Sequence, residues 1–345
     1  MKLSRWMCLG TLLALVMIAG HEAQADAGTY KVVAQYKVGG EGGWDILTVD
    51  PDAHRLYYGR GTRMQVFDVD SGKVIGEIPD TPGIHGVALA PDLGRGFTSN
   101  GRDSSVTVFD LKTLAVVSRI HLDGRNPDAI IYEPVTRRVF AFNAGSRSAT
   151  AIDAATSTVV GTVALDGRPE FAVADGRGKV FVNLEDSSAV AGFDAKTLKV
   201  GSRWPLMGGE GPSGIALDRV HHRLFSVCGN EKMGVLDSGS GKVVATLPIG
   251  KGPDGAEFDP GTGLAFSPNG EGTLTVIHED SADKFSVVGT VTTQRGARTM
   301  ALDPKTHRLY LAAASYGEAP APTADHPHPR PPMLPDSFVI LVLDR

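Results

Sequence analysis

One short phrase recurs seven times along this 345-residue chain, and its spacing restricts the fold more than any other feature. One copy runs from Gly211 to Phe225. Self-similarity at a fixed period is typical of one supersecondary unit that repeats, because each copy needs its neighbours to bury its faces. Aligned on the residue that closes the first apolar run, the copies lie 40 to 44 residues apart, at Asp50, Ala90, Glu133, Asp175, Asp218, Asp259 and Asp303.

Each copy contains four short runs rich in Val, Ile, Phe and Tyr, separated by Gly, Pro, Asp and Asn, which predicts four antiparallel strands. The third run ends on Asp in six copies, and His278 is the exception; the six are Asp68, Asp110, Asp153, Asp194, Asp237 and Asp344. We interpret the recurring carboxylates as acceptors for the amides of the following turn. Four strands per repeat of this length form a propeller blade, so the sequence predicts an all-β, seven-bladed β-propeller.

The two ends of the sequence predict how the ring closes. The seventh copy stops at Asp344-Arg345, directly after its third strand. The segment Tyr30–Val38 precedes the first copy and is similar to the fourth strand at Lys73–Ile78. We therefore expect the N-terminal strand to complete the last blade, which removes two exposed sheet edges.

Residues 1–25 have the layout of a secretory signal peptide. Lys2 and Arg5 provide a positive start, an apolar run follows, and Ala23-Gln24-Ala25 forms a small-x-small cleavage site. We predict cleavage after Ala25, a periplasmic or secreted protein and a propeller over residues 26–345. The apolar run is too short to cross a bilayer core of about 30 Å, so no membrane span is expected after cleavage.

Cysteine content and charge restrict the function classes. Of the two cysteines only Cys228 follows the predicted cleavage site, so we expect no intramolecular disulfide and interpret Cys228 as a small buried hydrophobe. The formal net charge is −5 and no basic stripe is visible, which argues against a nucleic-acid partner. The sequence holds no haem-attachment, nucleophile-elbow, metalloprotease or phosphate-loop motif. We therefore predict no catalytic residue, cofactor or metal, and a monomer.

The ends of the second strands carry a family resemblance. They read Phe97-Thr98-Ser99-Asn100, Phe140-Ala141-Phe142-Asn143 and Phe181-Val182-Asn183, each followed by a short loop and a strand that closes on Asp. On these residues the chain resembles the YVTN family of β-propellers, including YncE-like proteins. The resemblance implies an exported seven-bladed propeller and does not imply a reaction. Trp44-Asp45 is the only Trp-Asp pair, and it precedes a first strand, whereas a WD40 repeat carries this pair at a third strand.

Functional residues are best sought where the copies differ. Five residues before the aligned position the column is mixed in charge, and in a propeller it rings the channel mouth. The open interpretations are capping of strand starts and binding of channel water, a ligand site for a cation, an amine or a polar metabolite, or a metal site. The candidate ligand-binding residues are Trp44, Asp45, His85, Asp128, Glu170, Asp254 and Arg298, and the remaining copy carries Ser213.

Two further departures from the repeat are visible. The seventh copy holds a Pro-rich insertion at residues 315–337. We expect it on the mouth face, as a lid, a docking arm or a tolerated insertion. Its His326 and His328 are at most part of a weak metal site. Glu257 falls within an inner strand where the other copies carry Thr, Ala or Val, and a buried carboxylate needs a partner or a shifted pKa.

Three hypotheses for the function follow. The first is an exported, non-catalytic binding or scaffold protein that binds a small molecule or a protein partner at the channel-mouth face. The second is a propeller-type hydrolase or lyase, similar to a lactonase, that acts at the channel mouth. The third is an accessory partner of a periplasmic redox enzyme, docked through the Pro-rich insertion.

Overall fold

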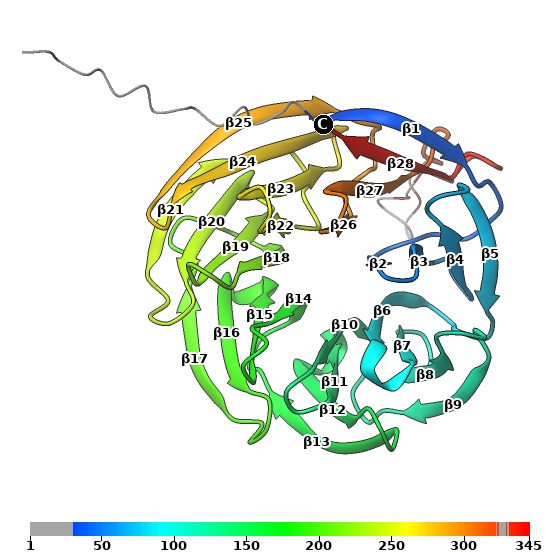
Figure 1. Ribbon diagram of the computed structural model, residues 1–345, viewed down its shortest axis with the longest axis horizontal. Coiled ribbons are helices and arrows are strands. Elements are labelled where there is room, and N and C mark those ends of the chain that lie inside the picture. Colours follow the sequence, from blue (N-terminus) through cyan, green and yellow to red (C-terminus); the bar gives the residue numbers. More distant parts are fainter. Residues whose placement is uncertain (1–29, 322, 324–328, 330) are drawn as a thin grey trace, which may run out of the picture.

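The computed structural model describes residues 30–321, 323, 329 and 331–345. Seven sheets of four antiparallel strands stand around a central channel (Figure 1). The predicted all-β, seven-bladed propeller is therefore confirmed. The part of the chain that the structure describes contains no α-helix, only three short 3-10 turns: η1 (Pro91–Leu93), η2 (Ala144–Ser146) and η3 (Glu185–Ser187).

Blades I to VII follow the chain. In blades I to VI the four strands are ordered outward from the channel as they occur in the sequence, whereas in blade VII the outermost strand comes from the N-terminal end of the described chain. The innermost strands are β2 (Leu47–Asp50), β6 (Ile84–Ala90), β10 (Pro127–Glu133), β14 (Pro169–Ala174), β18 (Pro212–Asp218), β22 (Glu257–Asp259) and β26 (Met300–Asp303). The second strands are β3 (Arg55–Gly59), β7 (Arg95–Asn100), β11 (Arg138–Asn143), β15 (Lys179–Leu184), β19 (Arg223–Cys228), β23 (Leu264–Asn269) and β27 (Arg308–Ala313). The third strands are β4 (Met64–Asp68), β8 (Ser105–Asp110), β12 (Ser148–Asp153), β16 (Ala189–Asp194), β20 (Lys232–Asp237), β24 (Thr273–Ser281) and β28 (Val339–Asp344). The outer strands are β5 (Lys73–Ile78), β9 (Val116–His121), β13 (Thr158–Ala164), β17 (Val200–Pro205), β21 (Val243–Pro248), β25 (Lys284–Thr292) and β1 (Lys31–Lys37).

The recurring acidic residues hold the turns, as the sequence predicts. Asp50 Oδ1 accepts the backbone N–H groups of Asp52 and Ala53, both at 3.0 Å. Asp194 Oδ1 accepts those of Lys196 at 3.0 Å and Thr197 at 2.6 Å. The Thr197 backbone bond is the largest cause that lowers the pKa of Asp194. The repeat's carboxylates are therefore structural at both turn types.

The N-terminal strand closes the ring by completing blade VII. β1 pairs antiparallel with β28, in a register that runs from Lys31 opposite Asp344 to Lys37 opposite Val339. Figure 1 shows β1 as the outer strand beside β28. The Tyr30 hydroxyl adds a bond of 2.8 Å to the carbonyl of His307. Closure by the N-terminal strand is thus confirmed.

Apolar side chains fill the spaces between neighbouring blades. Phe140 of blade III and Phe193 of blade IV belong to one buried cluster, with ring centroids 5.2 Å apart. Cys228 is fully buried in the cluster that includes Leu206, and burial raises the pKa of its thiol to about 11. The interpretation of Cys228 as a small hydrophobe agrees with this position.

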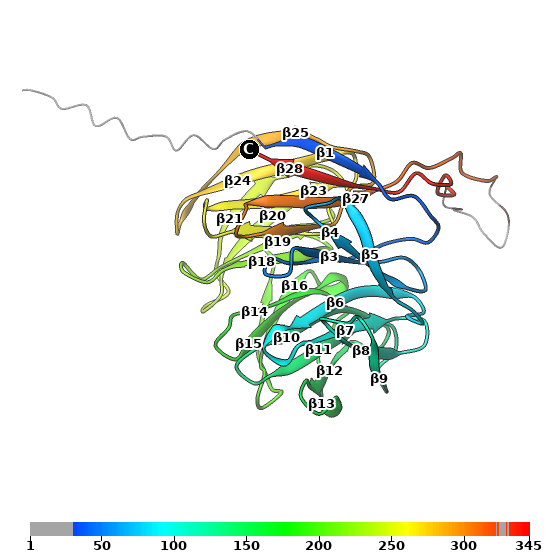
Figure 2. The ribbon, with the colours of Figure 1, turned by 45° about the vertical axis from the view of Figure 1, so that its right-hand side comes forward.

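The Pro-rich stretch 315–337 lies between β27 and β28, and its two ends pair with each other. Leu334 N–H donates to the carbonyl of Ser315 at 2.8 Å, and Gly317 N–H to that of Pro332 at 2.9 Å. Figure 2 shows the described parts of this segment extending beyond the ring.

Two sequence predictions fall outside the described residues: the signal peptide at 1–25 and the histidines His326 and His328. Within the described ranges, no helix has the length and apolar character that a membrane crossing requires.

Candidate functional site

The mixed-charge column lies at one end of the channel, where the chain enters the innermost strand of each blade. We call its members the mouth ring: Asp45, His85, Asp128, Glu170, Ser213, Asp254 and Arg298. The root of the Pro-rich stretch lies on the same face, because Asp336 Oδ1 accepts the N–H of Gly40, in the loop that leads to Asp45. The expected position of the insertion on the mouth face agrees with this contact.

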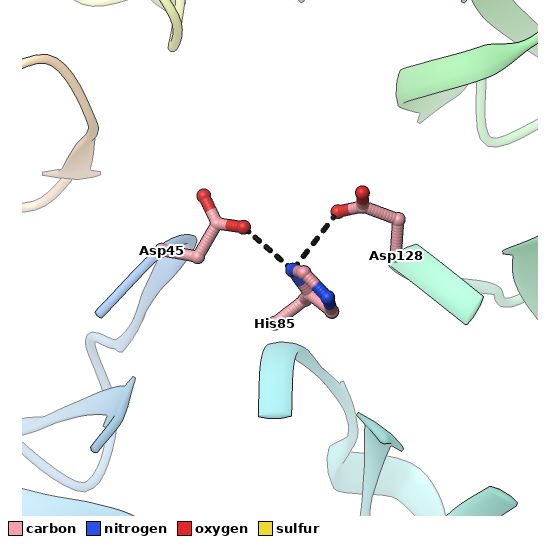
Figure 3. A group of neighbouring side chains, drawn as sticks. All are labelled: Asp45, His85 and Asp128. Atoms are coloured by element: carbon pink, nitrogen blue, oxygen red, sulfur yellow. Dashed lines mark hydrogen bonds and ion pairs between the residues drawn. The ribbon is translucent and has the colours of Figure 1, made fainter. Parts of the chain in front are cut away.

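Three members of the mouth ring meet at a common point (Figure 3). His85 Nδ1 lies 2.7 Å from Asp45 Oδ2 and 3.5 Å from Asp128 Oδ1, and the imidazole stands between the two carboxylates. Adjacent blades are fixed here, because Ile46 N–H donates to the carbonyl of His85 at 3.1 Å. The Ser99 hydroxyl also donates to the carbonyl of Asp128. The backbone that carries this cluster is therefore held in place from several sides.

The carboxylates set the charge of the imidazole. Burial of His85 opposes protonation, but the hydrogen bond to Asp45 and the charges of Asp128, Asp45 and Glu170 together raise its pKa to about 9. His85 is therefore a cation at neutral pH. Burial is the largest cause that raises the pKa of Asp128, and the His85 charge opposes it.

The other half of the mouth ring contains paired charges. Arg168 bridges Glu170 at 3.4 Å and Glu185 at 2.9 Å, and Arg298 lies 3.1 Å from Asp254. Burial, reinforced by neighbouring carboxylates, raises the pKa of Glu170 to about 8. Burial likewise raises the pKa of Asp254 against the opposing charge of Arg298. Carboxylates thus outnumber cations around the opening, and they repel one another.

The structure does not bring the remaining candidates into this cluster. The Trp44 ring packs against Phe338 with centroids 5.0 Å apart, in the seam between blades I and VII. The Ser213 hydroxyl donates to the carbonyl of Pro253 at 3.4 Å, which joins blades V and VI. Trp44 therefore packs between two blades, and Ser213 makes a hydrogen bond between blades V and VI.

Below the mouth ring the channel is a cavity of about 480 Å³, lined mainly by apolar side chains, with Asp50, Asp52, Arg219 and Glu257 as its charged lining residues. Four of its lining residues directly follow members of the mouth ring: Ile46, Ala129, Phe171 and Gly255. Glu257 lines the middle of the cavity, and Arg219 lies at its far end. Burial raises the pKa of Glu257 to about 8, and the Arg219 charge opposes this shift. The sequence singled out Glu257, and the structure shows it in the wall of the same cavity as Arg219, whose Nη2 donates to the carbonyl of Ala174.

Sequence reasoning missed Arg168 and Glu185. The sequence does contain a signal for Arg168. It lies seven residues before the aligned position, where five other copies carry Gly and one carries Asn, so an arginine is an exception there. Glu185 had none, because it reaches the ring from η3, outside the mixed column. The ligand atoms of Asp45, His85 and Asp128 all lie within 4.8 Å of one another, so these three residues have the geometry to hold a metal ion.

Comparisons with known proteins identify the fold alone. No family model matches the chain, and no curated protein matches it. Among solved structures, a chain of a mitotic checkpoint complex aligns at 12% identity and TM-score 0.74, over 97% of this chain and 99% of its own. The WD40 repeats of RRP9 align at 10% identity and TM-score 0.74, over 92% and 98%. A hydrazine synthase chain from Kuenenia stuttgartiensis aligns at 17% identity and TM-score 0.68, over 79% and 93%. These likenesses, all below 25% identity, agree with the propeller fold of this chain.

Proposed function

We propose that this chain is an exported, non-catalytic binding protein whose channel takes a small organic cation with an apolar tail. The observation that carries the proposal is that the acidic mouth ring continues directly into the apolar wall of the channel. Ile46, Ala129 and Phe171 line the apolar cavity and directly follow the acidic members Asp45, Asp128 and Glu170. A cationic head group at the mouth ring then leaves its alkyl tail in the channel, where burial of apolar area is favourable.

Electrostatics favour a cation over an anion. The carboxylates of Asp128, Glu170 and Asp254 all have raised pKa values, with burial as the largest cause and mutual repulsion as a further cause. A bound cation relieves that repulsion and lowers those pKa values, so binding releases protons. Affinity for the cation therefore rises with pH across the range in which these groups ionise.

A hydrolase or lyase at the mouth ring is the second proposal, favoured by one observation. Glu170 has a pKa of about 8 and is a proton donor at neutral pH, and Asp128 stands nearby in the ring as an acceptor. His85 is already protonated near pH 7 and does not serve as the base. Hydrolysis of lactones or esters by the wild type, lost in Asp128→Ala, would establish this second function.

The binding proposal is tested by calorimetry with three matched probes: hexyltrimethylammonium, hexanesulfonate and tetramethylammonium. We expect hexyltrimethylammonium to bind, hexanesulfonate to fail because its charge is reversed, and tetramethylammonium to bind more weakly because it lacks the tail. At pH 9, where both carboxylates are ionised, Glu170→Gln and Asp128→Asn are expected to weaken binding roughly tenfold each, since each removes an ionic contact with the head group. The control is Asp123→Asn, an exposed carboxylate on the same face.

Two results would overturn the binding proposal. One is equal binding of the cationic and the anionic probe, which would point to the apolar channel alone. The other is binding that Asp123→Asn weakens as much as Glu170→Gln does.

Export and membership of the YVTN family are part of the same proposal. They rest on the signal-peptide layout of residues 1–25 and on the strand-end residues around Asn100, Asn143 and Asn183. Expression of the full chain in a Gram-negative host, followed by N-terminal sequencing of the periplasmic fraction, tests export. The expected first residue is Asp26, and retention of an uncleaved chain in the cytoplasm would contradict it.

A further inference from the structure

A second cluster of ionisable side chains lies at the opposite end of the inner strands, between blades V and VI. Asp218 is the last residue of β18, and His221 follows it in the turn to β19. Glu279 comes from β24 of the next blade. His221 Nδ1 lies 2.8 Å from Asp218 Oδ2 and 3.3 Å from Glu279 Oε1. The three ligand atoms all lie within 4.8 Å of one another.

Glu279 is a buried carboxylate that the repeat does not require. Its backbone N–H donates to the carbonyl of Gly263, and the corresponding bonds in blades III and IV come from Ala154 and Ala195. Those two residues are fully buried alanines. The matching position in the other blades holds no carboxylate: Val69, Leu111, Ser238 and Arg345. A small apolar side chain therefore satisfies the fold here, and the acid needs another explanation.

The carboxylate of Glu279 is also poorly satisfied. Its side chain is 2% exposed, as is that of Asp218. Among the described residues, neither Oε1 nor Oε2 of the ionised Glu279 accepts a hydrogen bond, so its ion-pair contact with His221 balances the charge. Only a protonated Glu279 can share a hydrogen bond with Asp218. Arg223 lies close by, but its guanidinium is bonded to Asp237 Oδ2 at 2.6 Å and to the carbonyl of Ala282 at 2.6 Å. An unsatisfied buried carboxylate costs free energy unless a cation binds there.

We propose that Asp218, His221 and Glu279 form a binding site for a divalent transition-metal ion, for which Zn²⁺ is the best match, linking blades V and VI on the face opposite the mouth ring. One imidazole nitrogen and two carboxylate oxygens are ligands that Zn²⁺ accepts, at about 2.0 to 2.2 Å. Tetrahedral ligands at that distance lie about 3.4 Å apart, close to the 3.3 Å between His221 and Glu279. The 2.8 Å contact of His221 with Asp218 has to lengthen by about 0.6 Å when the ion binds. The imidazole disfavours Ca²⁺ and Mg²⁺, which prefer oxygen ligands throughout.

The surroundings leave an entry path and a fourth position. The His221 side chain is 48% exposed, so one side of the site faces solvent and a water completes the coordination. Asp218 also accepts the N–H groups of Val220 at 2.8 Å and His221 at 2.9 Å, which fixes two of the ligands relative to each other. Burial, with the charge of Asp218, raises the pKa of Glu279 to about 7. This site is independent of the function proposed for the channel.

The test is zinc binding to the purified mature chain after treatment with EDTA and dialysis. Calorimetry with ZnCl₂ is expected to give a saturable event in the wild type that Glu279→Ala and His221→Ala each abolish. His54→Ala is the matched control, because His54 and Asp70 make a His–Asp pair at the same 2.8 Å without a buried second acid. His85→Ala separates this site from the mouth ring, and it is expected to leave the event in place. MgCl₂ is expected to give no heat.

Thermal unfolding supplies a second readout. Zinc is expected to raise the Tm of the wild type and to leave that of Glu279→Ala unchanged. Without metal, Glu279→Ala is expected to unfold at a higher temperature than the wild type, because alanine removes the uncompensated buried acid. The proposal is overturned if zinc does not bind the wild type saturably, if Glu279→Ala retains binding, or if only His85→Ala loses it. His221→Ala changes an exposed side chain, so it decides the matter even if Glu279→Ala fails to fold.

Discussion

His85 Nδ1 and Asp45 Oδ2 lie 2.7 Å apart, although 40 residues separate them in the sequence. They occupy the same repeat position in neighbouring blades, and the ring brings the starts of β2 and β6 side by side. Because Asp128 approaches the same nitrogen from the third blade, one imidazole balances two carboxylates. This arrangement determines the protonation state of the channel mouth.

The first prediction concerns the titration of His85. An NMR pH titration of the imidazole is expected to give a pKa near 9, and Asp45→Asn is expected to lower it by about one unit or more because the charged hydrogen bond is lost. The folded-state pKa lies above the unfolded value, so this pairing stabilises the fold fully below about pH 6.5 and is lost as pH rises through 9. An unchanged His85 pKa in Asp45→Asn would contradict the assignment.

The second prediction concerns Glu257 in the channel wall. Burial raises the pKa of Glu257 in the folded state to about 8, above its ordinary value of 4.5. The resulting loss of stability is absent below about pH 4.5, grows as the pH rises, and is complete above about pH 8. Glu257→Gln is therefore expected to raise the Tm by roughly 2 to 6 °C at pH 8.5 and to have little effect at pH 4.5. Tm measured against pH for both chains is the test. A constant difference across the whole pH range would show that ionisation is not the cause.

The third prediction concerns the seam between blades I and VII. Arg60 is buried; its Nη2 donates to the carbonyls of Gly39 and Gly40, both at 2.9 Å, and its guanidinium lies 3.8 Å from the Phe338 ring centroid. Arg60→Ala leaves a cavity and unpaired carbonyls, so it is expected to lower the free energy of unfolding by about 2 to 4 kcal/mol in urea denaturation.

Arg63→Ala is the matched control for the seam. Arg63 lies three residues further along the chain and pairs with Glu77 at 3.1 Å, near the surface. A partly exposed ion pair contributes about 0 to 1 kcal/mol, so this variant is expected to stay close to the wild type. Equal losses from the two arginines would argue against a special role for Arg60.

The fourth prediction concerns ring closure. Removal of residues 30–38 exposes the edge of β28 and is expected to lower the Tm by roughly 10 °C or more and to broaden the transition. Deletion of the Pro-rich residues Glu318–Pro335 takes away no blade strand, so its Tm is expected to stay within a few degrees of the parent. Differential scanning calorimetry measures both. If the chain without β1 unfolds as cooperatively as the parent and at the same temperature, then β1 does not stabilise the ring by closing it.

The repeat made much of this molecule predictable. The strand-ending acids such as Asp50 and Asp194 fix their own turns through amides two and three residues away, and such local bonds depend on sequence neighbours alone. The closing role of β1 could also be predicted from the sequence. The seventh repeat lacks its own fourth strand, and one additional strand precedes the first repeat. For the mouth ring the sequence predicted only that its residues lie at the same level of the channel. It did not predict which side chains contact each other, because the repeat fixes the level of a residue and not the direction of its side chain.

By itself, therefore, the sequence determined the number of blades, the order of their strands, the turns and the closure, because those follow from short-range hydrogen bonds and from a period that every copy shares. Only the tertiary structure decided which charges meet. In the folded protein Trp44 packs against Phe338, Arg168 and Glu185 lie together at the mouth, and Glu279 lies near Asp218 across a blade boundary. Such pairings depend on how adjacent sheets pack, and residues from different blades contact each other only when the ring is closed.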